Sequence, residues 1–124
     1  MISPDADNRW SEIDMKQRRL SDPSGWLLLT QNVGVQLLIE ALVDSGGREF
    51  NKTELADYAG VSRPTVGTHM NLLLDLGVVR EVPNTSPQRY QFNSESPVSQ
   101  AILQVNGAVM ESIEDIDVSN YSVD

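Results

Sequence analysis

The stretch that decides the fold is FNKTELADYAGVSRPTVGTHMNLLLDLGVVREV, residues 50–82. Its first part has the signals of a short helix, because Asn51 can cap a helix in which Glu54 reaches back to the cap. Gly60 can adopt the left-handed conformation that ends a helix. Only Val61 separates this end from the next helix start. The stretch therefore predicts two helices joined by a very tight turn.

The second predicted helix begins at Ser62, which is a good N-cap residue. Pro64 is tolerated in the first turn because its missing N–H would have no partner within the helix. Apolar positions then recur at steps of four, three and four, the spacing of one buried helical face; they are Val66, Met70, Leu73 and Gly77. Two helices connected in this way predict a helix-turn-helix arrangement.

A small hairpin is predicted directly after this pair of helices. Residues 78–82, VVREV, are rich in β-branched side chains. Residues 88–93 alternate in character, with Tyr90 and Phe92 on one face, and the segment between, PNTSP, has the composition of a loop. A hairpin in this position is the wing of a winged helix-turn-helix fold.

The segments on either side of this core have helical patterns of their own. A weakly amphipathic helix is predicted within residues 7–20, before a turn at residues 21–25 that contains Pro and Gly. The next helix has apolar side chains at i, i+3, i+4 and i+7; they are Val35, Leu38, Ile39 and Leu42. Ser96 and Pro97 begin a last helix with a continuous apolar stripe, formed by Val98, Ile102, Val105, Val109 and Ile113.

We therefore expect a mostly α chain with a small β-hairpin, an α+β fold with flanking N- and C-terminal helices. The predicted organisation is an N-terminal extension or helix over residues 1–31, a winged helix-turn-helix core over residues 32–95, a C-terminal dimerisation helix over residues 96–113 and an acidic tail over residues 114–124.

The charge of the chain argues against nucleic-acid binding. Eighteen acidic residues and nine basic ones give a net charge of −9, whereas a DNA-binding domain is expected to be basic. The basic residues include only two lysines, Lys16 and Lys52. Acid-rich, lysine-poor surfaces resemble those of proteins from extreme halophiles, in which excess charge maintains solubility. Charge alone favours a protein that does not meet nucleic acid.

The counts of Cys and His and the lengths of apolar runs limit which activities and which cellular locations the sequence predicts. The chain has no Cys and one His, and no Gly-rich phosphate loop, so the sequence displays no metal cluster and no nucleophile–base pair. We expect no enzyme activity and no cofactor. The longest apolar run, residues 26–29, is too short to cross a bilayer, and residues 1–5 lack the features of a secretory signal. The expectation is a cytoplasmic protein without a membrane partner.

Residues 50–82 and residues 89–109, RYQFNSESPVSQAILQVNGAV, resemble winged helix-turn-helix transcriptional regulators of the MarR, ArsR and PadR type, and most closely the acidic haloarchaeal versions. The resemblance covers roughly residues 32–113. It implies a homodimer that binds double-stranded DNA sequence-specifically and regulates transcription. Residues 62–76 would lie in the major groove, and the wing, residues 78–93, on a flanking groove or the backbone.

Candidate contact residues follow from this implied docking. At 100° per residue, the side opposite the buried face carries Pro64, Thr65, Thr68, Asn71 and Leu72. The candidate DNA-binding residues are Lys52, Thr53, Ser62, Arg63, Thr65, Thr68, His69, Asn84, Thr85, Gln88 and Arg89. Some of these residues can be explained without a contact to DNA. Ser62 can be a helix cap alone, His69 can be half-exposed packing, and the two arginines can be solvated surface charges.

The alternative function is a winged-helix adaptor or transcription-complex subunit that does not read DNA, and the acidic surface favours it. The outward face of the helix over residues 62–76 carries Arg, Thr, His and Asn until Asp75, and this polar face favours DNA instead. The stripe of the last helix can pack on its own domain or on a second copy. The resemblance and the frequency of two-fold dimers favour the second copy, with Trp10 and Ile13 as possible additional contacts.

Overall fold

The computed structural model describes residues 14–121 of the chain, so Trp10 and Ile13 lie outside the described residues. In chain order the elements are α2 (Met15–Ser21), α3 (Gly25–Thr30), α4 (Val33–Asp44), β1 (Glu49–Phe50), α5 (Lys52–Ala59), α6 (Arg63–Asp75), β2 (Val79–Val82), β3 (Arg89–Phe92), α7 (Pro97–Ser112) and the 3-10 helix η2 (Val118–Tyr121). The expected mostly α, α+β composition is confirmed.

The local signals in the sequence account for where the central helices begin and end. The Asn51 side chain accepts a hydrogen bond from the Glu54 N–H at 2.8 Å, and Glu54 accepts one from the Asn51 N–H at 2.9 Å, which forms the predicted capping box of α5. Gly60 ends α5 with a φ of 75°. Only Val61 follows before Ser62, which caps α6 as the sequence predicts.

The sheet contains one strand more than the sequence predicts. β3 lies between β1 and β2 and pairs antiparallel with both. In the register, Phe50 faces Tyr90, and Val79 faces Phe92. β1 has only two residues, too few to show the alternation by which strands are recognised in a sequence. The expected hairpin is therefore the larger part of a three-stranded sheet.

One core joins the helices to the sheet. It contains most of the predicted faces of α4 and α6, together with α5 and the apolar side of the sheet: Val35, Leu38, Leu42, Phe50, Leu55, Ala56, Val66, Met70, Leu73, Val78, Val79 and Tyr90. Ile39 of the predicted α4 face is only partly buried against it. Each large side chain that is fully buried contributes about 1.5–3 kcal/mol relative to exposure. This core fixes α5, α6 and the hairpin relative to each other.

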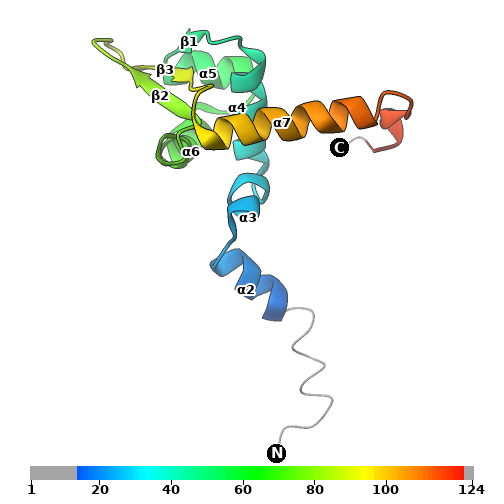
Figure 1. Ribbon diagram of the computed structural model, residues 1–124. Helices are drawn as coiled ribbons and strands as arrows, with labels where there is room; N and C mark the ends of the chain where they lie inside the picture. Colours follow the sequence, from blue (N-terminus) through cyan, green and yellow to red (C-terminus); the bar gives the residue numbers. More distant parts are fainter. Residues whose placement is uncertain (1–13, 122–124) are drawn as a thin grey trace, which may run out of the picture.

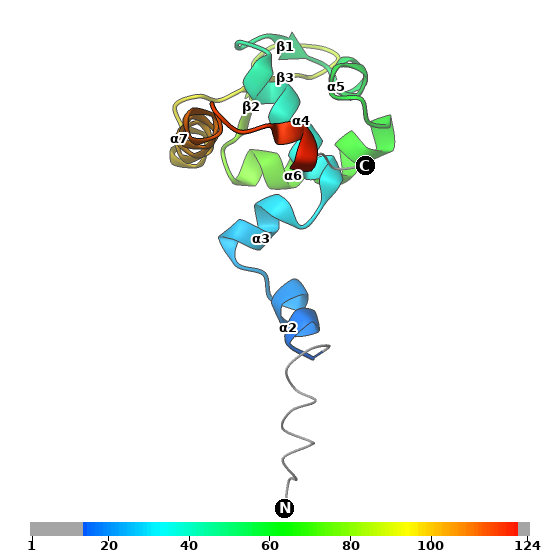
Figure 2. The same ribbon diagram turned by 90° about the vertical axis from the view of Figure 1, so that its right-hand side faces the viewer.

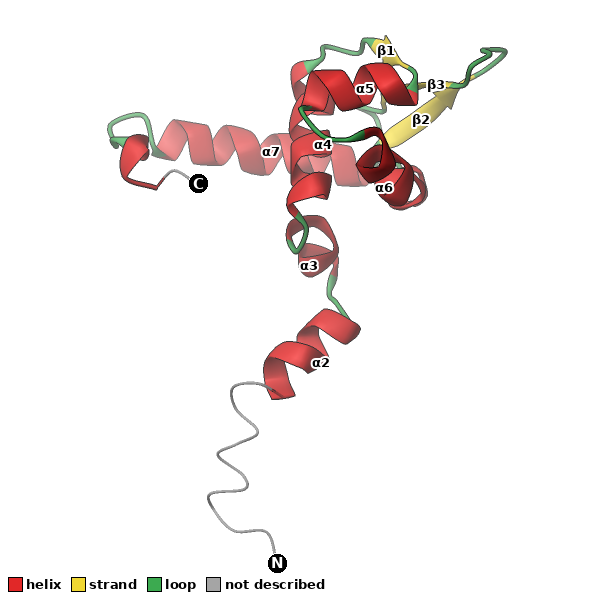
Figure 3. Ribbon diagram, turned by 180° about the vertical axis from the view of Figure 1, so that it is seen from behind, coloured by secondary structure: helices red, strands yellow, loops and turns green. Residues whose placement is uncertain are grey.

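The elements are arranged so that α6 and the β2–β3 hairpin lie on one side of the molecule (Figures 1 and 3). α7 begins beside them, crosses α4 and extends toward the opposite side (Figure 1). α2 and α3 lead away from the remainder of the chain, as Figures 1 and 2 both show. None of the described helices is long and apolar enough to span a membrane.

The apolar stripe of α7 is only partly covered within the chain. Val98 and Ile102 pack against the core, but half of the surface of Val105 and of Val109 is exposed. Ser99 is the one buried residue of the helix. The predicted stripe is therefore present, but it is covered only in part, with Val105 and Val109 left half exposed.

Candidate nucleic-acid interface

The outward face of α6 is polar and exposed. Val66, Met70 and Leu73 are buried on one side of the helix. On the other side the exposed residues are Arg63, Pro64, Gly67, Thr68, Asn71 and Asp75. The hydroxyl of Thr68 donates to the Pro64 carbonyl oxygen at 2.9 Å, so toward another molecule this hydroxyl is an acceptor.

Two predicted contact residues of α6 lie against α4 instead of outward. A Cβ added to Gly34 of α4 would come 2.8 Å from Cγ2 of Thr65 and 3.3 Å from Nε2 of His69. Both side chains are half-buried. Thr65 also shares a 2.8 Å hydrogen bond with the Ser62 hydroxyl. The sequence places Thr65 on the side opposite the core, and this placement is wrong. His69 lies as its alternative interpretation has it, as a half-exposed side chain that packs within the protein.

Leu72 requires the same correction. The sequence places it outward, but it packs against the core. The reason is the width of the buried arc. Val66, Met70 and Leu73 mark its centre, and a second strip of half-buried residues lies about 100° away on the helix, formed by Thr65, Leu72 and Leu76.

A depression of about 310 Å³ lies where α5, α6 and the hairpin loop meet. It is lined by Asn51, Lys52, Thr53, Arg63, Pro87, Gln88 and Tyr90. Lys52, Thr53, Arg63 and Gln88, four of the predicted contact residues, thus come together from three elements. No acidic residue lines the depression, and neither cation forms a salt bridge within the described residues. The depression is therefore a locally cationic site in an acidic chain.

The hairpin loop uses several of its predicted contact groups to hold its own shape. The Thr85 hydroxyl donates to the Val82 carbonyl oxygen and accepts from the Arg89 N–H, both at 2.9 Å. Nε2 of Gln88 donates to the carbonyl oxygens of Val82 and Arg89, both at 2.9 Å. Asn84 is exposed at the tip of the loop with a φ of 61°. Of these three residues, Asn84 is the one whose side chain is open to a partner.

Arg89 is engaged within the protein. Its Nη2 lies 3.0 Å from Oε1 of Glu54 and donates to the Glu49 carbonyl oxygen at 3.0 Å, and its Nε lies 3.7 Å from Oε1 of Glu49. These contacts tie β3 to β1 and to the first turn of α5. Sequence reasoning treats Arg89 as a DNA contact or a solvated charge, and the structure gives it a third role as a brace.

Glu54 is stabilised as a carboxylate by the same neighbourhood. The hydrogen bond from the Asn51 N–H is the main cause that lowers the pKa of Glu54, and the positive charges of Arg89 and Arg48 lower it further. Because a cap and a brace share this carboxylate, the first turn of α5 and the start of β3, at the loop end of the hairpin, are held by one group.

Sequence reasoning left two residues of the exposed face out of the candidate site. Asn71 was placed on the outward side by its helical angle but was not counted as a contact. Gly67 was missed, although nothing lies within 4 Å of a Cβ built on it. The same angular reasoning that selected Thr68 could have selected both, since all three lie within about 100° of one another.

The described residues contain no group of three or more His, Asp or Glu that could hold a metal ion. No protein-family model matches the chain, and no curated protein matches it either.

Proposed function

We propose that the chain is a winged helix-turn-helix protein that binds double-stranded DNA and regulates transcription. In this proposal α5 and α6 form the helix-turn-helix, α6 enters the major groove, and the β2–β3 hairpin is the wing. The observation that carries it is the polar face of α6. This face is exposed to solvent and lies on the same side of the molecule as the hairpin (Figure 3).

The side chains on this face suit base edges. The Asn71 amide can pair with the donor and acceptor of an adenine, and the Thr68 hydroxyl can accept from an exocyclic amine. Arg63 at the first turn can fork onto a guanine or a phosphate. Gly67 between them has no side chain, so the helix backbone can approach the floor of the groove closely.

The cationic depression suits a backbone phosphate. Lys52 and Arg63 supply positive charge from two helices, and Thr53 supplies a hydroxyl beside the positive end of α5. Phosphate contacts position a protein on the duplex without reading sequence. The net charge of −9 opposes approach to DNA, but at about 1 M salt the screening length is only about 3 Å. Local cations then outweigh distant acidic groups.

The test begins with selection of duplexes from a random pool by the purified chain. Thr68→Ala and Asn71→Ala should weaken binding to the selected duplex by about 5- to 150-fold, the equivalent of 1–3 kcal/mol for a lost base contact. Lys52→Gln should weaken binding to selected and random duplexes alike and should reduce the log–log salt slope by about 0.9 for each chain bound.

Gln104→Ala is the matched control, because Gln104 is exposed on α7 and belongs neither to the α6 face nor to the lining of the depression. It should bind as the parent does. If the parent enriches no sequence, or if the Thr68 and Asn71 variants bind as tightly as the control, DNA reading is excluded. The protein-adaptor function then becomes the better hypothesis.

A further inference from the structure

Gly34, the second residue of α4, lies directly against α6. A Cβ built on Gly34 would come 2.8 Å from Cγ2 of Thr65 and 3.3 Å from Nε2 of His69, two side chains one helical turn apart on α6. We infer that Gly34 is a positioning residue of the DNA-reading face, because the missing side chain sets how closely α6 crosses α4. The inference rests on the proposed function, since it concerns where α6 presents its outward face.

The crossing at Gly34 is closer than any other residue would allow. Carbon atoms in ordinary contact lie about 3.5–4.0 Å apart, so a methyl group at this point would push the two helices apart by roughly 1 Å. Glycine is also one of the least favourable residues within a helix. α4 therefore carries a poor helix former at the one position where alanine has no room against α6.

Thr65 is not free to turn aside from such a methyl group. Its Oγ1 lies 2.8 Å from Oγ of Ser62, the cap of α6, and a β-branched side chain has few rotamers in a helix. The displacement would therefore pass to the backbone of α6. The other near atom, Oδ1 of Asn32 at 3.0 Å, belongs to the exposed cap of α4 itself, so its movement leaves α6 in place.

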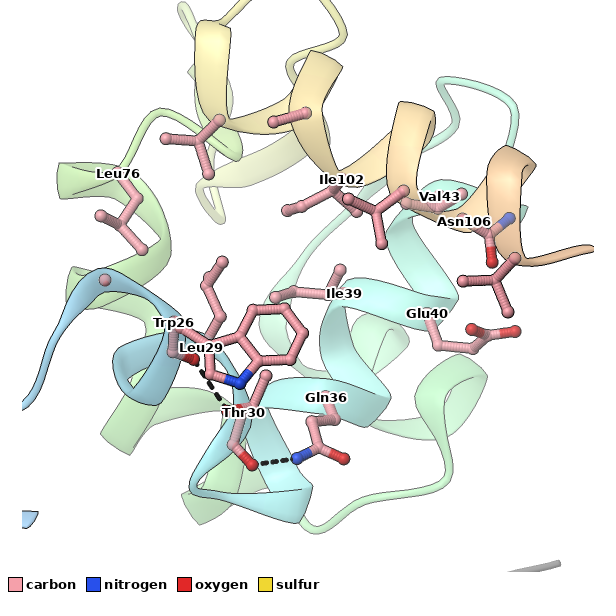
Figure 4. Close-up of a pocket in the computed structure, with 15 residues that line it drawn as sticks. Trp26, Leu29, Thr30, Gln36, Ile39, Glu40, Val43, Leu76, Ile102 and Asn106 are labelled. Atoms are coloured by element: carbon pink, nitrogen blue, oxygen red, sulfur yellow. Dashed lines mark hydrogen bonds between the residues drawn. The ribbon is translucent and has the colours of Figure 1, made fainter. Parts of the chain in front are cut away.

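The C-terminal end of α6 is held separately. Leu73 is completely buried, and Leu76, the C-cap of α6, lines an apolar groove of about 550 Å³ between α3, α4 and α7 (Figure 4). A push at Thr65 would therefore tilt α6 about this end and displace mainly its first two turns, which carry Arg63 and Thr68. Hydrogen bonds weaken steeply as their geometry departs from the ideal, so the tilt would cost base contacts although no contact residue has changed.

Phosphate contacts depend less on this crossing. Lys52 and Thr53 belong to α5, whose first turn is held to β3 by the ion pair between Glu54 and Arg89. Phosphate contacts support binding to any duplex, whereas base contacts distinguish one sequence from another. A change at Gly34 should therefore weaken binding to a selected sequence much more than binding to a random one. A loss of folded protein would weaken both alike.

Binding of the full chain to the selected duplex and to a random duplex of equal length tests the inference. Gly34→Ala should weaken binding to the selected duplex by about 5- to 150-fold, the range for a lost base contact, and to the random duplex by less than about 3-fold. Thr65→Ser removes Cγ2 and keeps the hydroxyl. The double variant should bind the selected duplex to within about 3-fold of Thr65→Ser alone.

Gly107→Ala is the matched control. Gly107 is a glycine within α7, and nothing lies within 4 Å of a Cβ built on it. This variant should bind both duplexes as the parent does. The inference is overturned if Gly34→Ala binds the selected duplex like the parent, if it loses equally on both duplexes, or if the double variant shows no recovery. Recovery also excludes a disturbed cap of α4, which Thr65→Ser would not repair.

Folding and the proposed function are tested apart from this. If Gly34→Ala does not fold by circular dichroism, the double variant must fold and bind for the inference to stand. If the parent enriches no sequence, the proposed function fails, and amide chemical shifts decide the crossing. In Gly34→Ala the shifts should change along α6 from Arg63 to His69 and return in the double variant. Changes confined to the first turn of α4 would overturn the close crossing itself.

Discussion

α6 and α7 begin in the same way and are packed very differently. Ser62 and Ser96 cap them with hydroxyls that accept from the N–H of the third residue of each helix, at 3.2 and 3.1 Å. A proline lies in the first turn of both, at Pro64 and Pro97. Both then carry apolar side chains at helical spacing. α6 is enclosed by α4, α5 and β2, whereas α7 contacts the domain mainly through its first turns (Figure 1).

The difference teaches what an apolar pattern can specify. Periodicity marks the face of a helix that avoids water, and in α6 it marks the buried residues Val66, Met70 and Leu73. It does not name the surface that covers this face. In α6 that surface is the core of the same chain, so its exposed side is left for a partner. In α7 Val98 and Ile102 of the apolar side pack against the core, whereas Val105 and Val109 stay half exposed.

The largest effect should come from truncating the enclosed face. Leu73→Ala should lower the free energy of unfolding by about 2–5 kcal/mol, because Leu73 is completely buried and the alanine leaves a cavity. This loss should be the same at every protein concentration if it is expressed per chain. Chemical denaturation at two concentrations measures it.

Val109→Ala is the corresponding change on α7. If a second copy covers this face of α7, the effect of Val109→Ala on stability should depend on protein concentration, because a residue in a dimer interface stabilises the fold by mass action. An effect of Val109→Ala that is large and independent of concentration would mean that α7 is covered within its own chain, and the contrast between the two helices would be lost.

An intermediate effect is expected where the two helices are joined. Gly77 follows α6 with a φ of 77°, and a Cβ built on it would lie 3.1 Å from Cβ of Ser96, the cap of α7. Gly77→Ala should therefore lower the free energy of unfolding by about 1–3 kcal/mol through backbone strain, with a further loss from this contact. Thermal unfolding gives the size of the loss.

Gly60 provides the matched control. Its φ is 75°, but nothing lies within 4 Å of a Cβ built on it. Gly60→Ala should show the backbone strain alone. If the two variants lose the same stability, Ser96 moves aside at no cost, and the end of α6 is not tightly linked to the start of α7.

The parts of the fold that depend on local signals could be predicted from the sequence. The capping box of α5, the left-handed Gly60 and the Ser62 cap each depend on a few neighbouring residues. β1 could not be predicted, since a strand of two residues exists only because β3 lies beside it. The break between α3 and α4 was also not foreseen, although Asn32 caps α4 by accepting from the Gly34 N–H at 2.8 Å.

The candidate site was predicted less completely. Polar side chains there can form hydrogen bonds either within the protein or with another molecule, and the sequence does not distinguish the two. Thr85 and Gln88 are polar loop residues, and nothing in their sequence spacing indicates that they bond to the loop itself. Thr65 faces α4 because Gly34 leaves room for it, which is a contact between distant residues. Sequence periodicity could select the exposed Thr68 and Arg63, whose positions depend only on their own helix.

The smallest expected effect concerns Arg89, and it separates a brace from a DNA contact. Its guanidinium is bonded to Glu54 and to the Glu49 carbonyl oxygen, and its side chain is 32% exposed. If Arg89 positions the hairpin, Arg89→Gln should weaken binding to the selected duplex modestly and leave the log–log salt slope unchanged. A phosphate contact would instead lower the slope by about 0.9 for each chain.

Two further variants complete this test. Arg89→Lys keeps the positive charge, so a phosphate contact that is lost in Arg89→Gln should return. Lysine lacks the planar fork that reaches both glutamate residues, so the brace should not return. Glu54→Gln removes the shared carboxylate. Because the folded pKa of Glu54 is lowered, its contribution to stability is present at neutral pH and is lost as the pH falls below the ordinary range of glutamate, about 4. The stability difference between the parent and Glu54→Gln should therefore shrink in acid, and a difference that persists there would assign the brace to groups other than this carboxylate.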